Sequence, residues 1–118
     1  DESVKETQIL ILCPTHELVH QIYEVAVELS KYLDVSIMEV VGGTNVTECR
    51  RELDKNPQII IGTPGRVLDM IQKQSLFTNN IHTLVFDEAD EILSRGFKED
   101  IHDIIQSVDK HSQEKLCF

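Results

Sequence analysis

The chain has 118 residues, which suits one packed domain and is too short for two. Apolar residues make up 41% and charged residues 27%, proportions that exclude an intrinsically disordered chain or a collagen-like repeat. Twenty-one acidic residues against eleven basic ones give a formal charge of −10, so the overall electrostatic field repels nucleic acid and anionic membranes. Any contact with phosphate must therefore be local.

The cysteines and the amino terminus exclude further classes. Cys13, Cys49 and Cys117 are odd in number and widely spaced, which is typical of reduced intracellular thiols rather than a zinc site or a disulfide framework. The amino terminus is acidic, and the apolar run at residues 9–13 is too short for a signal peptide or a membrane span. We expect no membrane partner.

Short apolar runs and helical patterns alternate along the first half of the chain. Residues 8–13 form the first apolar run, and apolar side chains then recur at steps of three and four from Leu18 to Leu33, which predicts a helix. Residues 35–41 form a second run that is rich in β-branched residues. Asn45 is expected to be the N-cap of the mostly polar helix that follows.

The second half continues the alternation. Residues 58–61 form a third strand, and Pro64 occupies the expected first position of the next helix. A fourth strand is predicted at residues 83–86, followed by a short helical turn and a helix at residues 97–108. The apolar residues 116–118 are expected to form a further strand.

These elements predict an α/β fold with three layers. Continuous Val, Ile and Leu strands are typical of strands buried on both faces, as in a parallel sheet built from right-handed βαβ units. In such a sheet the segments that follow the strands gather at one edge, where ligands bind. Four segments of this chain are candidates for that edge.

The first candidate is Asp87-Glu88-Ala89-Asp90, directly after an apolar strand. A carboxylate at a strand tip can hold a magnesium ion through water, and the next acid can position a water for attack on a phosphoryl group. The ordinary alternative is an acidic helix start, because acids favour the first turn of a helix.

The other three candidates are suited to phosphate. Thr63 is an expected N-cap before Pro64, which leaves helix amides open to a phosphate, and Arg66 adds a charge. Two consecutive glycines allow close approach to the backbone, and the segment after the first strand again begins a helix. The alternatives are ordinary capped helices and a tight turn. The candidate residues are Pro14, Thr15, His16, Gly42, Gly43, Thr63, Pro64, Gly65 and Arg66.

These segments together resemble the first RecA-like domain of the DEAD-box ATP-dependent RNA helicases. The acidic segment from Asp87 to Asp90 is similar to motif II of the family, and Thr63-Pro64-Gly65-Arg66 to motif Ib. Gly42-Gly43 matches the GG doublet, and the segment from Pro14 to Leu18, with Gln21, matches motif Ia. The stretches GGTNV, GTPGRVLDMI and DEADEILSRGFKEDI are similar to the translation initiation factor 4A branch.

The resemblance implies a P-loop NTPase fold and roles for the acids. Asp87 would coordinate magnesium through water, Glu88 would orient the hydrolytic water, and Asp90 would link ATP to interdomain contacts. The three other segments would hold RNA by its sugar-phosphate backbone without reading bases. The implied cofactors are ATP and magnesium. The implied process is local RNA unwinding in translation initiation, with scaffold proteins as partners, in the cytoplasm or the nucleus.

Two features depart from the family. His16 stands where the family usually has Arg, and a largely neutral imidazole is a weaker phosphate ligand than a guanidinium. None of the five glycines is followed by Lys, so the chain has no P-loop. The family's Q motif and P-loop would lie before Asp1, and its Ser-Ala-Thr motif and second domain after Phe118. We therefore expect a partial domain, incomplete at both ends, that alone does not hydrolyse ATP.

Three alternatives to this interpretation have features that the sequence can be compared with. A receiver domain needs paired acids after the first strand, where this chain has Cys13, Pro14 and Thr15. A non-catalytic binding module would use the acidic stretch from Asp87 to Asp103. Other DEAD-box roles, in ribosome assembly, splicing or mRNA decay, share the same motifs.

Overall fold

The computed structural model describes residues 6–109 and 116–117. Five strands form one parallel sheet in the order β2-β3-β1-β4-β5. The strands are β1 (Ile9–Leu12), β2 (Ile37–Val40), β3 (Ile59–Gly62), β4 (Thr83–Phe86) and β5 (Leu116–Cys117). The helices are α1 (His16–Leu29), α2 (Val46–Leu53), α3 (Pro64–Gln72), α4 (Ala89–Ser94) and α5 (Lys98–Asp109).

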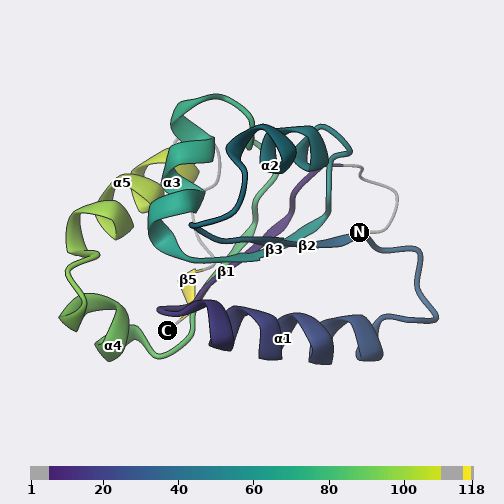
Figure 1. Ribbon diagram of the computed structural model, residues 1–118, viewed down its shortest axis with the longest axis horizontal. Coiled ribbons are helices and arrows are strands. Elements are labelled where there is room, and N and C mark those ends of the chain that lie inside the picture. Colours follow the sequence, from purple (N-terminus) through teal and green to yellow (C-terminus); the bar gives the residue numbers. More distant parts are fainter. Residues whose placement is uncertain (1–5, 110–115, 118) are drawn as a thin grey trace.

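The sheet lies between two helical layers, as Figure 1 shows, with α1 on one side and α2 and α3 on the other. The alternation of side chains along each strand supplies both cores. Leu10 and Ile60 belong to the larger cluster, under α2, α3, α4 and α5. Ile11 and Ile61 belong to the smaller cluster with Val19 of α1. The expected three-layer parallel architecture is confirmed.

The expected helix through Leu33 is shorter than predicted. Helix α1 ends at Leu29, where the backbone N–H of Ser30 donates to the Ala26 carbonyl. Leu29 and Leu33 are 79% and 56% exposed, since the sheet offers these apolar positions no surface to pack on. Burial of an apolar face stabilises most helices, so the apolar spacing from Leu29 to Leu33 does not extend the helix.

The other predicted elements agree more closely with the structure. Asn45 caps α2 by accepting a hydrogen bond from the Glu48 backbone N–H at 3.0 Å. Strand β2 is confined to Ile37–Val40, within the predicted residues 35–41. The terminal strand pairs with β4 through Leu116–Cys117, and Phe118 lies outside the described residues. Within the described residues, no helix has the length and apolarity needed to cross a membrane.

Candidate functional site

The carboxyl ends of four strands lie in one row. Val40, Gly62, Leu12 and Phe86 are in register across β2, β3, β1 and β4. The residue after three of these strands is fixed by a backbone N–H bond to the neighbouring strand end, at 2.9–3.0 Å. The three bonds run from Thr63 to Val40, from Cys13 to Gly62, and from Asp87 to Leu12. The predicted site segments therefore start from one sheet edge.

Gly62 allows the end of β3 to lie close to the end of β2. A Cβ at Gly62 would lie 2.3 Å from the Val40 carbonyl oxygen and 2.7 Å from a Val67 methyl carbon. Real Cβ atoms do not approach backbone so closely, so any side chain here would push β3 away from β2. The glycine brings α3 directly against the end of the strand.

The acidic segment turns sharply out of β4. Asp87 is half-buried, Glu88 is exposed, and Glu88 has the left-handed conformation, with φ 55° and ψ 57°. That conformation costs a residue with a side chain about 1–2 kcal/mol. Glu88 precedes α4, yet its side chain caps no helix amide. Strained residues without a structural role cluster at functional sites, which favours the catalytic interpretation over the acidic helix start.

The carboxylates of this segment are available to a ligand. Within the described residues, the side chains of Asp87, Glu88 and Asp90 make no hydrogen bond or ion pair. No group of three or more His, Cys, Asp or Glu side chains in that part of the chain could hold a metal by itself. Magnesium usually takes one or two carboxylates and completes its shell with water and phosphate. Asp87 fits that kind of site, with Glu88 next to it in the chain.

Cys13 lies beneath these acids at the end of β1. Its side chain is buried, and burial, then the charges of Asp87 and Glu88, raise the pKa of the thiol to about 12. A thiol with that pKa stays protonated at neutral pH and is a poor nucleophile or metal ligand. The Cys13 side chain therefore serves to fill the smaller hydrophobic core.

The first of the segments predicted to hold phosphate leads into α1. Thr15 is the N-cap, and its hydroxyl accepts a hydrogen bond from the Leu18 backbone N–H at 3.2 Å. Pro14 is buried, and His16 is exposed at the start of the helix. A Cβ at Gly43 would lie 3.6 Å from the His16 ring, so motif Ia and the GG doublet lie side by side. Gly43 has φ 82°, a conformation that favours glycine.

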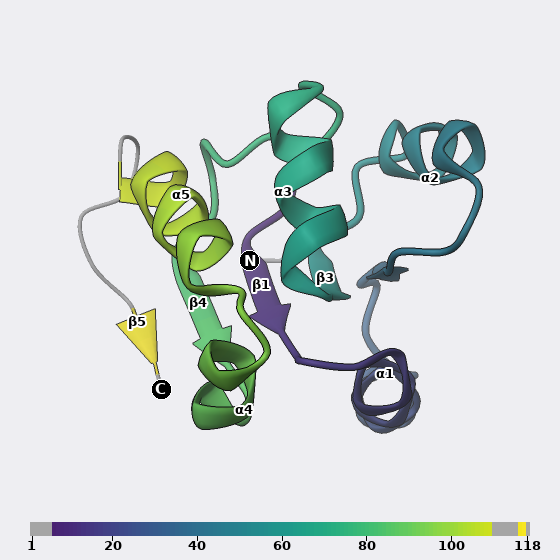
Figure 2. The same ribbon diagram turned by 60° about the vertical axis from the view of Figure 1, so that its left-hand side comes forward.

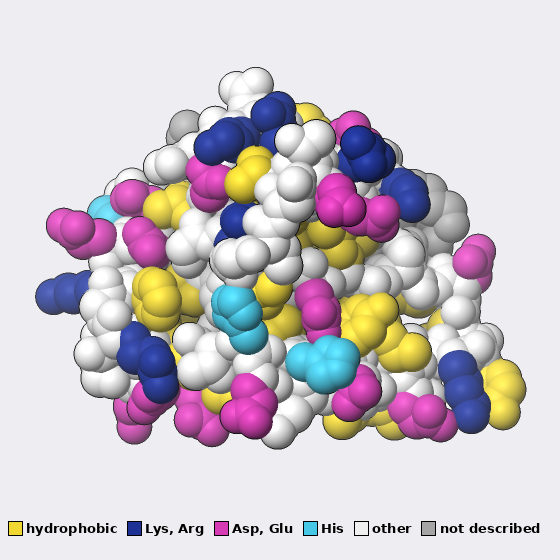
Figure 3. All heavy atoms as spheres, in the orientation of Figure 1, with side chains coloured by type: hydrophobic (Ala, Val, Ile, Leu, Met, Phe, Trp, Pro, Cys, Tyr) yellow, Lys and Arg dark blue, Asp and Glu magenta, His cyan; other side chains and the backbone are white. Residues whose placement is uncertain are grey.

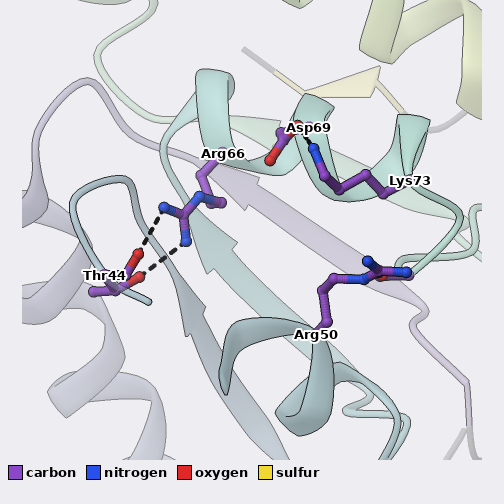
Figure 4. A network of polar contacts seen from close by, with 6 residues as sticks. Thr44, Arg50, Arg66, Asp69 and Lys73 are labelled. Atoms are coloured by element: carbon purple, nitrogen blue, oxygen red, sulfur yellow. Dashed lines mark hydrogen bonds and ion pairs between the residues drawn. The ribbon is translucent and has the colours of Figure 1, made fainter. Parts of the chain in front are cut away.

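The Arg66 side chain joins the other two segments (Figure 4). It donates one hydrogen bond to the Thr44 hydroxyl at 3.0 Å and another to the Thr44 carbonyl oxygen at 2.9 Å. The Thr44 hydroxyl itself donates to the Val41 carbonyl oxygen at 2.8 Å. Arg66 thus bonds the glycine loop in this structure, and its contact with phosphate stays a prediction.

Thr44 is a site residue that the sequence interpretation missed. In the sequence, Thr44 could have been noticed because its hydroxyl directly follows the two glycines. The helix predicted after Thr63 carries a single arginine, Arg66, that could donate to it. The expected helix start is confirmed: Thr63 is the N-cap, Pro64 is the first helical residue, and Gly65 is exposed. The Thr63 side chain makes no capping bond, so no hydroxyl of its own occupies the α3 amides.

The surface agrees with local rather than broad phosphate contact. Figure 3 shows basic side chains gathered at the upper edge and acidic ones along the lower edge, where Figure 1 shows α1 and α4. The face as a whole mixes both signs.

The sequence profile of the DEAD/DEAH box helicase family matches residues 1–118. The chain belongs to this family. It is 47% identical over 113 residues to the ATP-dependent RNA helicase eIF4A of Neosartorya fischeri, a match that covers 96% of this chain and 28% of that protein. It is 51% identical over 104 residues to the ATP-dependent RNA helicase fal1 of Botryotinia fuckeliana, covering 88% of this chain and 26% of that one.

A solved structure confirms the fold. The crystal structure of the yeast DEAD-box splicing factor Prp28 matches 99% of this chain and 29% of that chain, with 30% identity and a TM-score of 0.89. The sheet is therefore that of a RecA-like DEAD-box domain. The chain spans between a quarter and a third of the length of these relatives.

Proposed function

We propose that this chain is part of the first of two RecA-like domains of an ATP-dependent RNA helicase, which couples ATP hydrolysis to local separation of RNA strands. The observation that carries the proposal is the shared sheet edge. Asp87 and Glu88 follow β4, and their side chains have no hydrogen-bond or ion-pair partner among the described residues. Three segments suited to phosphate follow β1, β2 and β3.

The acids have distinct roles in this proposal. Asp87, fixed by its backbone bond to Leu12, would hold magnesium through water. The bound ion would neutralise charge on the ATP phosphates. Glu88 would accept a hydrogen bond from the attacking water, and its side chain caps no amide of the helix that follows. Asp90 would link the nucleotide site to the second domain.

The remaining segments would hold RNA. The amides at the α3 start, with Thr63, Pro64 and Gly65, would receive one phosphate. The glycine loop, held in place by Arg66, would receive the backbone beside His16. Backbone amides do not distinguish bases, so the RNA contact would be independent of sequence.

The proposal is tested by ATP hydrolysis in the whole protein that contains this chain. Glu88→Gln keeps the shape of the side chain and removes its charge, and the expected loss of hydrolysis is about 100-fold or more. Glu91→Gln is the matched control, because Glu91 is in α4 and pairs with Arg95 at 2.7 Å. Unchanged hydrolysis in Glu88→Gln would reject the role of Glu88.

We also propose that the process served is translation initiation, with scaffold proteins as partners and the cytoplasm as location. The 47% identity to eIF4A supports this proposal, and the 51% identity to fal1 makes another DEAD-box role the alternative to test. Depletion of the protein from a translation extract tests the proposal. Restored translation on adding the protein back would support initiation, and normal translation with defective ribosomal RNA processing in depleted cells would favour ribosome assembly instead.

A second candidate function uses the acidic surface. The stretch from Asp87 to Asp103 contains seven acidic residues and only two basic ones, Arg95 and Lys98. Such an excess of negative charge suits a module that binds a basic protein. Binding of a basic partner that survives Asp87→Asn and Glu88→Gln would favour this function over catalysis.

A further inference from the structure

An acidic side chain lies beside the proposed phosphate site at the start of α3. Helix α5 packs against α3, as Figure 2 shows. Asp100, in the first turn of α5, reaches the exposed Gly65: a Cβ at Gly65 would lie 4.0 Å from the Asp100 Oδ2 oxygen. A carboxylate therefore stands next to the helix amides to which RNA phosphate is assigned above.

The position of Asp100 in the first turn of α5 is electrostatically favourable for an acid, because the start of a helix carries partial positive charge. Asp100 is half-buried, and it makes no hydrogen bond or ion pair with the described residues. Asp69, on the next turn of α3, is by contrast paired with Lys73 at 2.7 Å. The nearest strong cation on α3, Arg66, donates to Thr44 instead. Apart from the positive start of α5, no side chain among the described residues compensates the charge of Asp100 at this end of α3.

We propose that Asp100 limits the affinity of this edge for RNA. This rests on the proposed function of the α3 start as a phosphate site. The carboxylate attracts the same positive helix terminus that would attract phosphate, and it repels a phosphate bound there. RNA would bind less tightly than the amides alone allow, which makes release after each cycle of strand separation easier.

The size of the effect follows from Coulomb's law. Two unit charges about 6 Å apart, at an effective dielectric constant between about 40 and 80, change a dissociation constant by about three- to tenfold. Because both charges are near solvent, added salt reduces this difference. A purely structural role for Asp100 would move the melting temperature and leave RNA affinity unchanged.

The experiment measures binding of a fluorescent polyuridine oligonucleotide to the whole protein with a non-hydrolysable ATP analogue. Asp100→Asn is expected to bind about three- to tenfold more tightly than wild type at low salt, with a smaller gap at high salt. Asp100→Glu keeps the charge and is expected to retain wild-type affinity. The matched control is Glu99→Gln, the same loss of charge one residue earlier, at the surface hollow lined by Lys98, His102 and Asp103.

Each outcome separates this inference from the function it rests on. Tighter binding by Asp100→Asn alone supports the inference. Equal binding by Asp100→Asn and Glu99→Gln, with RNA still bound by wild type, overturns it while the helicase proposal stands. Failure of the wild-type protein to bind polyuridine at all overturns the RNA-binding part of the proposed function itself.

Discussion

The double hydrogen bond from Arg66 to Thr44 predicts that these two residues act on RNA as one unit. Thr44→Val removes the hydroxyl that accepts from Arg66 at 3.0 Å and leaves the carbonyl contact at 2.9 Å in place. Arg66→Lys removes the forked geometry, because an ammonium group cannot span both oxygens in the same way. Either change should loosen the glycine loop beside His16.

The magnitude follows from the exposure of the pair. A hydrogen bond with a charged donor contributes about 1.5–3 kcal/mol, and water competes at this exposed threonine, so about 1 kcal/mol is a fair value for the hydroxyl bond. That energy corresponds to about fivefold weaker RNA binding for Thr44→Val. Arg66→Lys, which loses the forked pair of bonds, should weaken binding by about tenfold or more.

The assay is a double-mutant cycle on RNA affinity in the whole protein. If Arg66 acts through Thr44, adding Thr44→Val to Arg66→Lys should cost almost nothing further, giving a coupling energy of about 1 kcal/mol. Asp69→Asn is the matched control, because Asp69 lies on the same helix and pairs with Lys73. Fully additive effects would refute the reasoning and show that Arg66 contacts phosphate independently of the loop.

Three further predictions concern single side chains. His16→Arg should tighten RNA binding in the whole protein, and an unchanged dissociation constant would show that this position contacts no phosphate. Glu88→Gly should raise the thermal stability by about 1 kcal/mol while hydrolysis is lost, since glycine relieves the φ of 55°; an unchanged melting temperature would contradict the strain. Glu39, then Glu24, raises the pKa of His20, so an NMR titration of Glu39→Gln should give a lower pKa. Any stability from this pair is present at low pH and is lost as the pH rises through the raised folded-state pKa.

Much of the fold could be predicted because its strands are buried on both faces. The runs around Leu10, Ile60 and Leu84 are continuous and apolar, a pattern that few other architectures produce. The end of α1 could not be predicted, because the apolar spacing continues to Leu33 after the sheet surface has ended. Periodicity reports which residues could be buried and not whether a partner surface exists.

The site could be predicted as a set of segments but not as a set of contacts. The spacing of the acids after β4 and of Thr63, Pro64 and Gly65 after β3 identified the edge from sequence. The bond between Arg66 and Thr44 depends on how α3 meets the glycine loop, across 22 residues of chain. The strain at Glu88 likewise arises from the turn between β4 and α4, for which a glutamate gives no local signal.

The central claim is that one sheet edge serves both ATP hydrolysis and RNA. Its most direct test is the rate of ATP hydrolysis by the whole protein with and without RNA, in wild type, Arg66→Lys and Glu88→Gln. The account predicts that RNA stimulates the wild-type rate, that Arg66→Lys raises the RNA concentration needed for stimulation, and that Glu88→Gln removes hydrolysis under both conditions. A hydrolysis rate that does not change when RNA is added, or that persists in Glu88→Gln, would contradict the shared role of this edge.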